Sequence, residues 1–204
     1  MLFRSEVFGN EPLAVRLLQA AVSAATCWVP YALARAACGP VAGLCAALLA
    51  ACYPLFVFFS GILMAETLLL GCVAAALWQV QRLLAEPGLV RAAGLGATLG
   101  IGALCKPVLL AWLPFLAAIL WVQMALPPRS KLGYLAMLSA TLVISVAPWT
   151  LRNFQVSGRL VPISTNLGIN LLVGHEENAT GRYRDGADYW QMMEETSEIG
   201  RAHV

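Results

Sequence analysis

The sequence predicts an all-α polytopic membrane protein with about six transmembrane helices and the start of an extracytoplasmic segment. Of its 204 residues, 60% are hydrophobic and 12% are charged, whereas a soluble domain has about 45–50% apolar and about 25% charged residues. Charge is also unevenly distributed, because four acidic residues lie in residues 1–159 and seven in residues 160–204. The first three quarters of the chain are therefore expected to lie in a membrane and the last quarter in water.

Six apolar runs, bounded by charges, proline and glycine, are candidates to cross a hydrocarbon core of about 30 Å, which takes roughly 20 residues. We expect spans at about 14–36, 41–60, 64–84, 88–105, 107–126 and 132–148. The fourth is short and requires Arg91 to snorkel. Lys106-Pro107 separates it from the fifth, because a charge followed by a helix breaker predicts a turn. Residues 1–13 are then an extracytoplasmic lead-in, and residues 149–197 an incomplete extracytoplasmic segment.

Small residues are concentrated in the fourth predicted span. Its glycines have the spacing GxGxxxGxG and no strand precedes them, so they indicate close helix packing rather than a dinucleotide-binding loop. The cysteines form neither a CxxC pair nor a metal-ligand cluster, so we interpret them as small apolar residues within helices. The net charge of +2 is too small to indicate nucleic acid as a partner.

The predicted loops place the charged residues on two faces of the membrane. One face receives Arg35, Arg82, Arg91, Arg129 and Lys131. The other receives Arg16, Glu66, Lys106, Arg152 and the acidic tail. The positive-inside rule makes the first face cytoplasmic and the second extracytoplasmic, which predicts a multi-pass protein of the cell's inner (plasma) membrane.

Glu66 and Lys106 are the first candidate site residues. A charge within the membrane costs on the order of 3 kcal/mol, so Glu66 either caps the third span at the interface or orients a substrate hydroxyl or a metal. Lys106 either snorkels at a turn or binds the phosphate of a lipid.

Further candidates follow the sixth predicted span. Arg152 either anchors the helix behind Trp149 or contacts phosphate, and Asn153 follows it directly. Residues 158–181 mix Asn, Ser, Thr and Gly with short apolar runs, which suits a generic ordered loop as well as a loop that binds a polar ligand through Asn166 and Asn170.

Four segments resemble the membrane-embedded C-type glycosyltransferases that use polyprenyl-phosphate sugars, notably the dolichyl-phosphate-mannose-protein mannosyltransferase-like group that includes aminoarabinose transferases. The segments are Ala14-Val15-Arg16-Leu17-Leu18, Tyr53-Pro54 through Ala65-Glu66-Thr67, Leu104-Cys105-Lys106-Pro107, and Pro148-Trp149-Thr150-Leu151-Arg152-Asn153 continuing through Ser164-Thr165-Asn166 and Ile169-Asn170 to Ala179-Thr180-Gly181. The last segment is the most specific, and together they span about residues 10–184. At the position of His175 the family usually has Asn.

The resemblance implies transfer of a sugar from a polyprenyl phosphate to an extracytoplasmic lipid, glycan or protein, with inversion at the anomeric carbon. The phosphate leaves as an anion and needs cations, a role that suits Lys106 and Arg152. Some relatives use a divalent ion, for which Glu66 with His175 is a chemically reasonable ligand set. The catalytic base of the family is an Asp in the first extracytoplasmic loop, whereas the first Asp of this sequence is Asp185. We therefore expect an inactive fragment whose catalytic loop lies upstream.

The two ends of the chain support the interpretation as a fragment. Residues 198–204 and 2–5 resemble translations of the two strands of a short-read sequencing adapter, so we expect both segments to be foreign to the gene.

Two other classes of membrane protein remain as alternatives: a transporter, and a flippase or polymerase of lipid-linked polysaccharides. A transporter usually places charges near the bilayer midplane and shows inverted repeats, whereas these charges lie at predicted helix ends. The alternatives differ in accessibility, because a transferase predicts Glu66, Lys106 and Arg152 on one surface and a transporter predicts a path open to both sides.

Overall fold

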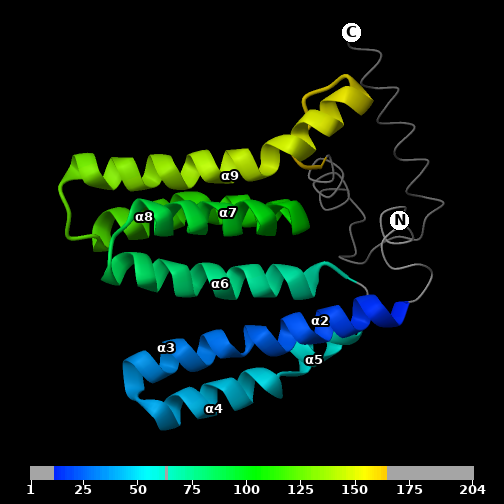
Figure 1. The fold of residues 1–204 in the computed structure, drawn as a ribbon, viewed down its shortest axis with the longest axis vertical. Coiled ribbons are helices and arrows are strands. Elements are labelled where there is room, and N and C mark those ends of the chain that lie inside the picture. Colours follow the sequence, from blue (N-terminus) through cyan, green and yellow to red (C-terminus); the bar gives the residue numbers. More distant parts are fainter. Residues whose placement is uncertain (1–11, 63, 165–204) are drawn as a thin grey trace, which may run out of the picture. The chain divides into compact units, whose positions relative to one another are not determined.

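The computed structural model describes residues 12–62 and 64–164, and the chain divides into two units, residues 1–163 and 164–204. Every regular element in the described residues is a helix (Figure 1), which confirms the all-α prediction. The helices are α2 (Pro12–Thr26), α3 (Trp28–Cys38), α4 (Pro40–Ala51), α5 (Pro54–Gly61), α6 (Glu66–Ala85), α7 (Leu89–Cys105), the 3₁₀ helix η1 (Pro107–Trp112), α8 (Leu113–Gln123) and α9 (Pro128–Ser157).

The helices that are long and apolar enough to cross a membrane number three within the described residues: Leu13–Cys38, which joins α2 and α3, then α6 and α9. A fourth is obtained if α4 and α5, bent by 49° relative to each other, form one span. The prediction of about six spans is therefore wrong in number. At 1.5 Å per residue, the 17 residues of α7 reach only about 25 Å, and the fifth predicted span is divided into η1 and α8.

The bend between α4 and α5 has a local cause. Tyr53 precedes Pro54 and adopts an extended conformation, with φ −68° and ψ 120°. The ring of a proline disfavours the helical region for the residue before it, so the chain leaves the helix at Tyr53 and starts a new helix at Pro54.

Helices α2 and α3 run in one direction, α4 and α5 run back, and the segments that follow continue to alternate (Figure 1). The charged residues of the connections therefore collect at two ends of the first unit. Arg35 and Arg82 lie in the last turns of α3 and α6 at one end. Glu66, which starts α6, and Lys106, which follows α7, lie at the opposite end. We call this second end, where α9 also finishes, the Glu66 end.

Close packing of α7 against α9 forms the centre of the first unit. The side chains of Leu95 and Leu99 on α7 are buried, and a Cβ atom added to Gly96 would lie 2.1 Å from the carbonyl oxygen of Leu138 on α9. One turn further, a Cβ on Gly100 would lie 2.7 Å from the Cβ of Ser145. The glycines of α7 therefore allow the two backbones to approach, as the spacing predicted.

Helix α9 extends beyond the span predicted for it. The sequence placed the end of the sixth span at residue 148, but the helix continues through Pro148 to Ser157 and ends at Gly158, which has φ 67°. Proline lacks an N–H group and clashes with the preceding turn, so it bends a helix that tertiary contacts maintain, and α9 changes direction in its last third (Figure 1). Residues 149–157, predicted to start the extracytoplasmic segment, are therefore helical.

Candidate functional site

An ion pair joins the start of α6 to the end of α7. The Lys106 Nζ atom lies 2.6 Å from the Glu66 Oε1 atom, and their side chains are 45% and 16% exposed. Lys106 has extended backbone angles because α7 stops before Pro107 and η1 begins there. The pair therefore brings together two candidates that are separated by 40 residues in the sequence.

The start of α6 is fixed by hydrogen bonds from buried polar side chains. The Thr67 Oγ1 atom donates to the carbonyl oxygen of Phe59 on α5 at 2.8 Å, and only 2% of Thr67 is exposed. The Gln19 amide of α2 donates to the carbonyl oxygen of Met64 at 2.7 Å. These bonds hold the chain on both sides of Glu66 against neighbouring helices.

The end of α9 holds a short return segment, residues 158–163, against itself. The Asn153 amide donates to the carbonyl oxygens of Val161 and Ile163 at 3.1 and 3.3 Å. The indole of Trp149 also donates to the carbonyl oxygen of Ile163, at 3.1 Å. Asn153 therefore uses its amide donors within the protein.

Arg152 lies on the same turn of α9, and its guanidinium stacks over the ring of Trp149 at 5.1 Å. Within the described residues it has no carboxylate partner. Lys106 pairs with Glu66, whereas the Arg152 side chain is exposed and pairs with no carboxylate of the described residues.

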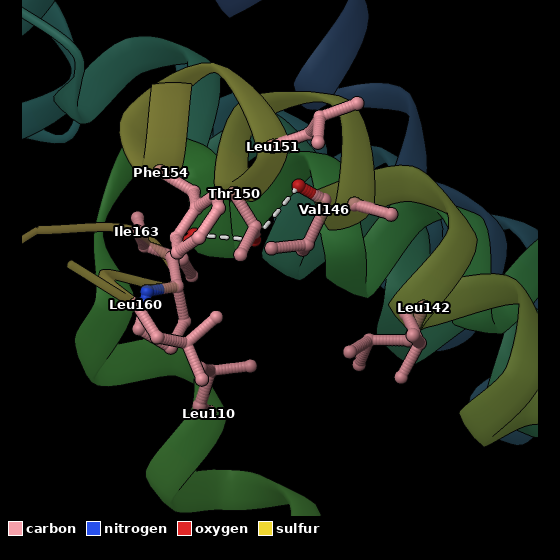
Figure 2. Close-up of a pocket in the computed structure, with 11 residues that line it drawn as sticks. Leu110, Leu142, Val146, Thr150, Leu151, Phe154, Leu160 and Ile163 are labelled. Atoms are coloured by element: carbon pink, nitrogen blue, oxygen red, sulfur yellow. Dashed lines mark hydrogen bonds between the residues drawn. The ribbon is translucent and has the colours of Figure 1, made fainter. Parts of the chain in front are cut away.

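An apolar groove of about 550 Å³ lies between α9, η1 and the return segment (Figure 2). Its lining is almost entirely aliphatic or aromatic, and Thr150 contributes the polar exception, whose hydroxyl donates to the carbonyl oxygen of Pro162 at 2.8 Å. The lining residues are Leu110, Leu142, Val143, Val146, Ala147, Thr150, Leu151, Phe154, Leu160, Pro162 and Ile163.

The groove and the ion pair belong to the same end of the first unit. Ala103, three residues before Lys106, packs in one buried cluster with Val146 and Ile163 of the groove wall, and Leu110 packs against that cluster. Arg152 directly follows Leu151 of the groove lining. The Glu66 end therefore combines an ion pair, an exposed arginine and a hydrocarbon-lined groove.

Three of the predicted site residues, Asn166, Asn170 and His175, lie outside the described residues, as do residues 2–5 and 198–204. Within the described part, no three residues of the types His, Cys, Asp and Glu come close enough to hold a metal ion. Glu66, the carboxylate suggested as a metal ligand, binds the ammonium of Lys106, and a metal site that it would form with His175 stays a prediction.

Several residues of this end are not identified by sequence patterns. Gln19 lies among apolar residues of α2 and Thr67 directly follows Glu66, and their burial at 5% and 2% exposure follows only from helix packing. The one available signal is a glutamine between Leu18 and Ala20. The groove also depends on the bend at Pro148 and on the return of residues 160–163, which the sequence did not predict.

Comparison with known proteins gives one match. A family model described as dolichyl-phosphate-mannose-protein mannosyltransferase matches residues 2–149. The matched range includes Glu66 and Lys106 and ends before Arg152. No curated protein and no solved structure matches the chain.

Proposed function

Because the chain belongs to the dolichyl-phosphate-mannose-protein mannosyltransferase family, we propose that it acts in the transfer of a sugar from a polyprenyl-phosphate donor to an extracytoplasmic lipid, glycan or protein. The family implies glycosyltransferase activity in general. The choice of donor, inversion at the anomeric carbon, and a site on the outer face of the inner membrane are the specific parts of the proposal.

Two observations support the assignment of the donor site: the Glu66 end carries an apolar groove, and Arg152, which follows Leu151 of its lining in the sequence, has no carboxylate partner among the described residues. A polyprenyl phosphate has the matching composition, an anionic group at the end of a branched hydrocarbon chain. The groove would bury the first isoprene units, since apolar burial contributes about 25 cal/mol per Å². The guanidinium of Arg152 would hold the phosphate by two parallel hydrogen bonds.

The leaving phosphate would give Lys106 and Arg152 of the Glu66 end a role. In the proposed reaction the acceptor attacks the anomeric carbon and loses its proton to a general base, which the family resemblance assigns to an Asp, while the bond from that carbon to the phosphate oxygen breaks and the phosphate leaves as an anion. Fixed positive groups that meet this developing charge lower the barrier. Lys106 would exchange Glu66 for the phosphate, and the released carboxylate would accept a hydrogen bond from a sugar hydroxyl.

The remaining predicted residues have supporting roles in this proposal. Asn166 and Asn170 would donate hydrogen bonds to the sugar from the segment that follows the groove in sequence. Glu66 with His175 would be the ligands if a divalent cation takes part. The orientation follows the positive-inside rule, which puts the end carrying Arg35 and Arg82 in the cytoplasm.

Lipid binding tests the proposal without requiring turnover. The full chain in lipid nanodiscs would be titrated with undecaprenyl phosphate and with undecaprenol, and bound lipid would be counted by native mass spectrometry. We expect undecaprenyl phosphate to bind at least about tenfold more tightly, which corresponds to about 1.4 kcal/mol. Equal binding of the two lipids would contradict the proposal.

Arginine variants locate the phosphate. Arg152→Gln is expected to remove most of the preference for undecaprenyl phosphate. The matched control is Arg35→Gln at the other end of the unit, because Arg35 stacks over Tyr31 at 5.8 Å much as Arg152 stacks over Trp149. The control should bind both lipids as the unaltered chain does.

A further inference from the structure

The geometry of the Glu66–Lys106 pair depends on the two residues that precede α6. Residues 62–65 connect α5 to α6, Met64 and Ala65 are the last two of them, and Glu66 is the first helical residue after them. A displacement of this connection would move the Glu66 carboxylate directly, because the helix axis starts there. The contact that fixes the connection from the side of α2 comes from Gln19.

Gln19 reaches the connection across the interface of α2 and α6. Its side chain is 5% exposed, and its Nε2 atom donates to the carbonyl oxygen of Met64 at 2.7 Å. Further along the same interface, Val22 and Thr26 face Gly71 of α6, with contacts of 3.3 Å to a Cβ built on that glycine. The two helices therefore run parallel, and Gln19 is the residue of α2 that bonds beside Glu66.

The other half of the Gln19 amide has an unusual environment. Within the described residues its Oε1 atom is buried and has no hydrogen-bond partner. A buried amide oxygen without a donor is costly, and the cost is greater where no water is present. An apolar side chain of similar size would remove this penalty together with the single bond to Met64. Stability alone therefore does not explain a glutamine at position 19, and its hydrogen bond to the Met64 carbonyl oxygen indicates another role.

We propose that Gln19 is a positioning residue that holds the Met64 carbonyl, and through it the Glu66 carboxylate, in register with Lys106. The inference deepens the proposed function and rests on it, since it assigns the pair a geometry that serves the donor phosphate. It adds a third helix, α2, to the elements that determine the site.

A zero-length cross-link measures the pair itself, independently of any ligand. A carbodiimide activates the Glu66 carboxylate, and the Lys106 amine displaces the activated group to form an amide, with loss of one water overall. The cross-linked peptides would be quantified by mass spectrometry on the full chain in nanodiscs. In Gln19→Met we expect the yield to fall at least about threefold while the melting temperature stays the same or rises.

Thr26→Val is the matched control. Thr26 is also buried on α2 against α6, but its hydroxyl donates within its own helix, to the carbonyl oxygen of Val22 at 2.8 Å. The control should give the cross-link yield of the unaltered chain. Gln19→Asn provides a second test if Gln19→Met fails to fold, because it keeps a buried amide but withdraws it from Met64. An unchanged yield in a folded Gln19 variant would overturn the inference.

Lipid binding separates failure of the inference from failure of the proposed function. Gln19→Met should strengthen binding of undecaprenyl phosphate about threefold, because a displaced Glu66 competes less with the phosphate for Lys106, and leave undecaprenol unaffected, and in a Glu66→Gln background it should have no further effect. If the unaltered chain does not prefer undecaprenyl phosphate, the proposed function fails while the cross-link still decides the role of Gln19. If that preference exists and Gln19→Met leaves both it and the cross-link unchanged, the inference alone fails.

Discussion

Replacement of Gly96 by alanine tests the packing that holds α7 against α9. The added Cβ would lie 2.1 Å from the Leu138 carbonyl oxygen and from the Thr141 Oγ1 atom, whereas ordinary contacts begin at 3.4 Å. The two helices would have to separate by about 1.3 Å, the difference between these distances. Overpacking of this kind costs about 1–3 kcal/mol, and we expect the upper value because one of the atoms belongs to the backbone.

Gly94→Ala is the matched control on the same helix. A Cβ at that position would lie 3.4 Å from the Gln79 Oε1 atom, which is an ordinary contact. Both substitutions gain about 1 kcal/mol of helix propensity, so their difference isolates the packing cost of about 3 kcal/mol. For a chain of 204 residues, this corresponds to roughly 6–12 °C in melting temperature, at about 2–4 °C per kcal/mol.

The assay is thermal unfolding of both variants in the same detergent, followed by the fraction of protein that stays monodisperse. We expect Gly96→Ala to melt well below Gly94→Ala, and Gly94→Ala to melt at or slightly above the unaltered chain. Equal melting temperatures for the two variants would refute the close approach of α7 and α9. Such a result would also remove the structural basis for placing Lys106 near the groove.

Three further predictions concern the Glu66 end. Glu66→Gln and Lys106→Met should each lower the free energy of unfolding by about 1–2 kcal/mol, because each change leaves one partly buried charge unpaired. The double variant should lose little more than either single variant. Additive losses in denaturant titrations would contradict the ion pair. Asn153→Ala removes two hydrogen bonds and should cost about 1–2 kcal/mol, with faster cleavage of residues 158–163 in limited proteolysis; unchanged cleavage would argue against the return segment. Ala147→Trp fills the groove and should weaken undecaprenyl phosphate binding at least about tenfold. Ile144→Trp is the control, because Ile144 lies on the same helix but outside the lining, and it should leave binding unchanged. Equal effects of the two substitutions would argue against the groove as the lipid site.

The all-helical architecture was predictable because it follows from composition and from the length of apolar runs. Proline and glycine fixed several boundaries correctly: Lys106-Pro107 separates α7 from η1, and the spacing of glycines in α7 matches the approach to α9. The number of spans was not predictable by the same means. Apolarity does not report where a backbone bends: the break before Pro54 follows from the proline, which the count of apolar residues overlooks, and the division between η1 and α8 appears only in three dimensions.

The candidate site was predictable in part. Single charges at the ends of apolar runs identified Glu66, Lys106 and Arg152, since such charges are rare within a membrane. The direct pairing of Glu66 with Lys106 depends on α6 and α7 being neighbours and was not evident from the sequence. Asn153 was a candidate site residue, and the hydrogen bonds of its amide to the return segment were not evident from the sequence. Gln19 acquires its role only from the parallel packing of α2 on α6.

Photo-cross-linking of a polyprenyl phosphate to the full chain would show directly whether the groove of α9 and η1 holds the lipid. The probe would carry a diazirine in its first isoprene unit, next to the phosphate, and the labelled peptides would be sequenced by mass spectrometry. We expect labels on the groove lining, chiefly within residues 142–163 and at Leu110, with competition by unlabelled undecaprenyl phosphate and much weaker competition by undecaprenol. Labels confined to other helices, or labelling that both lipids suppress equally, would contradict this expectation.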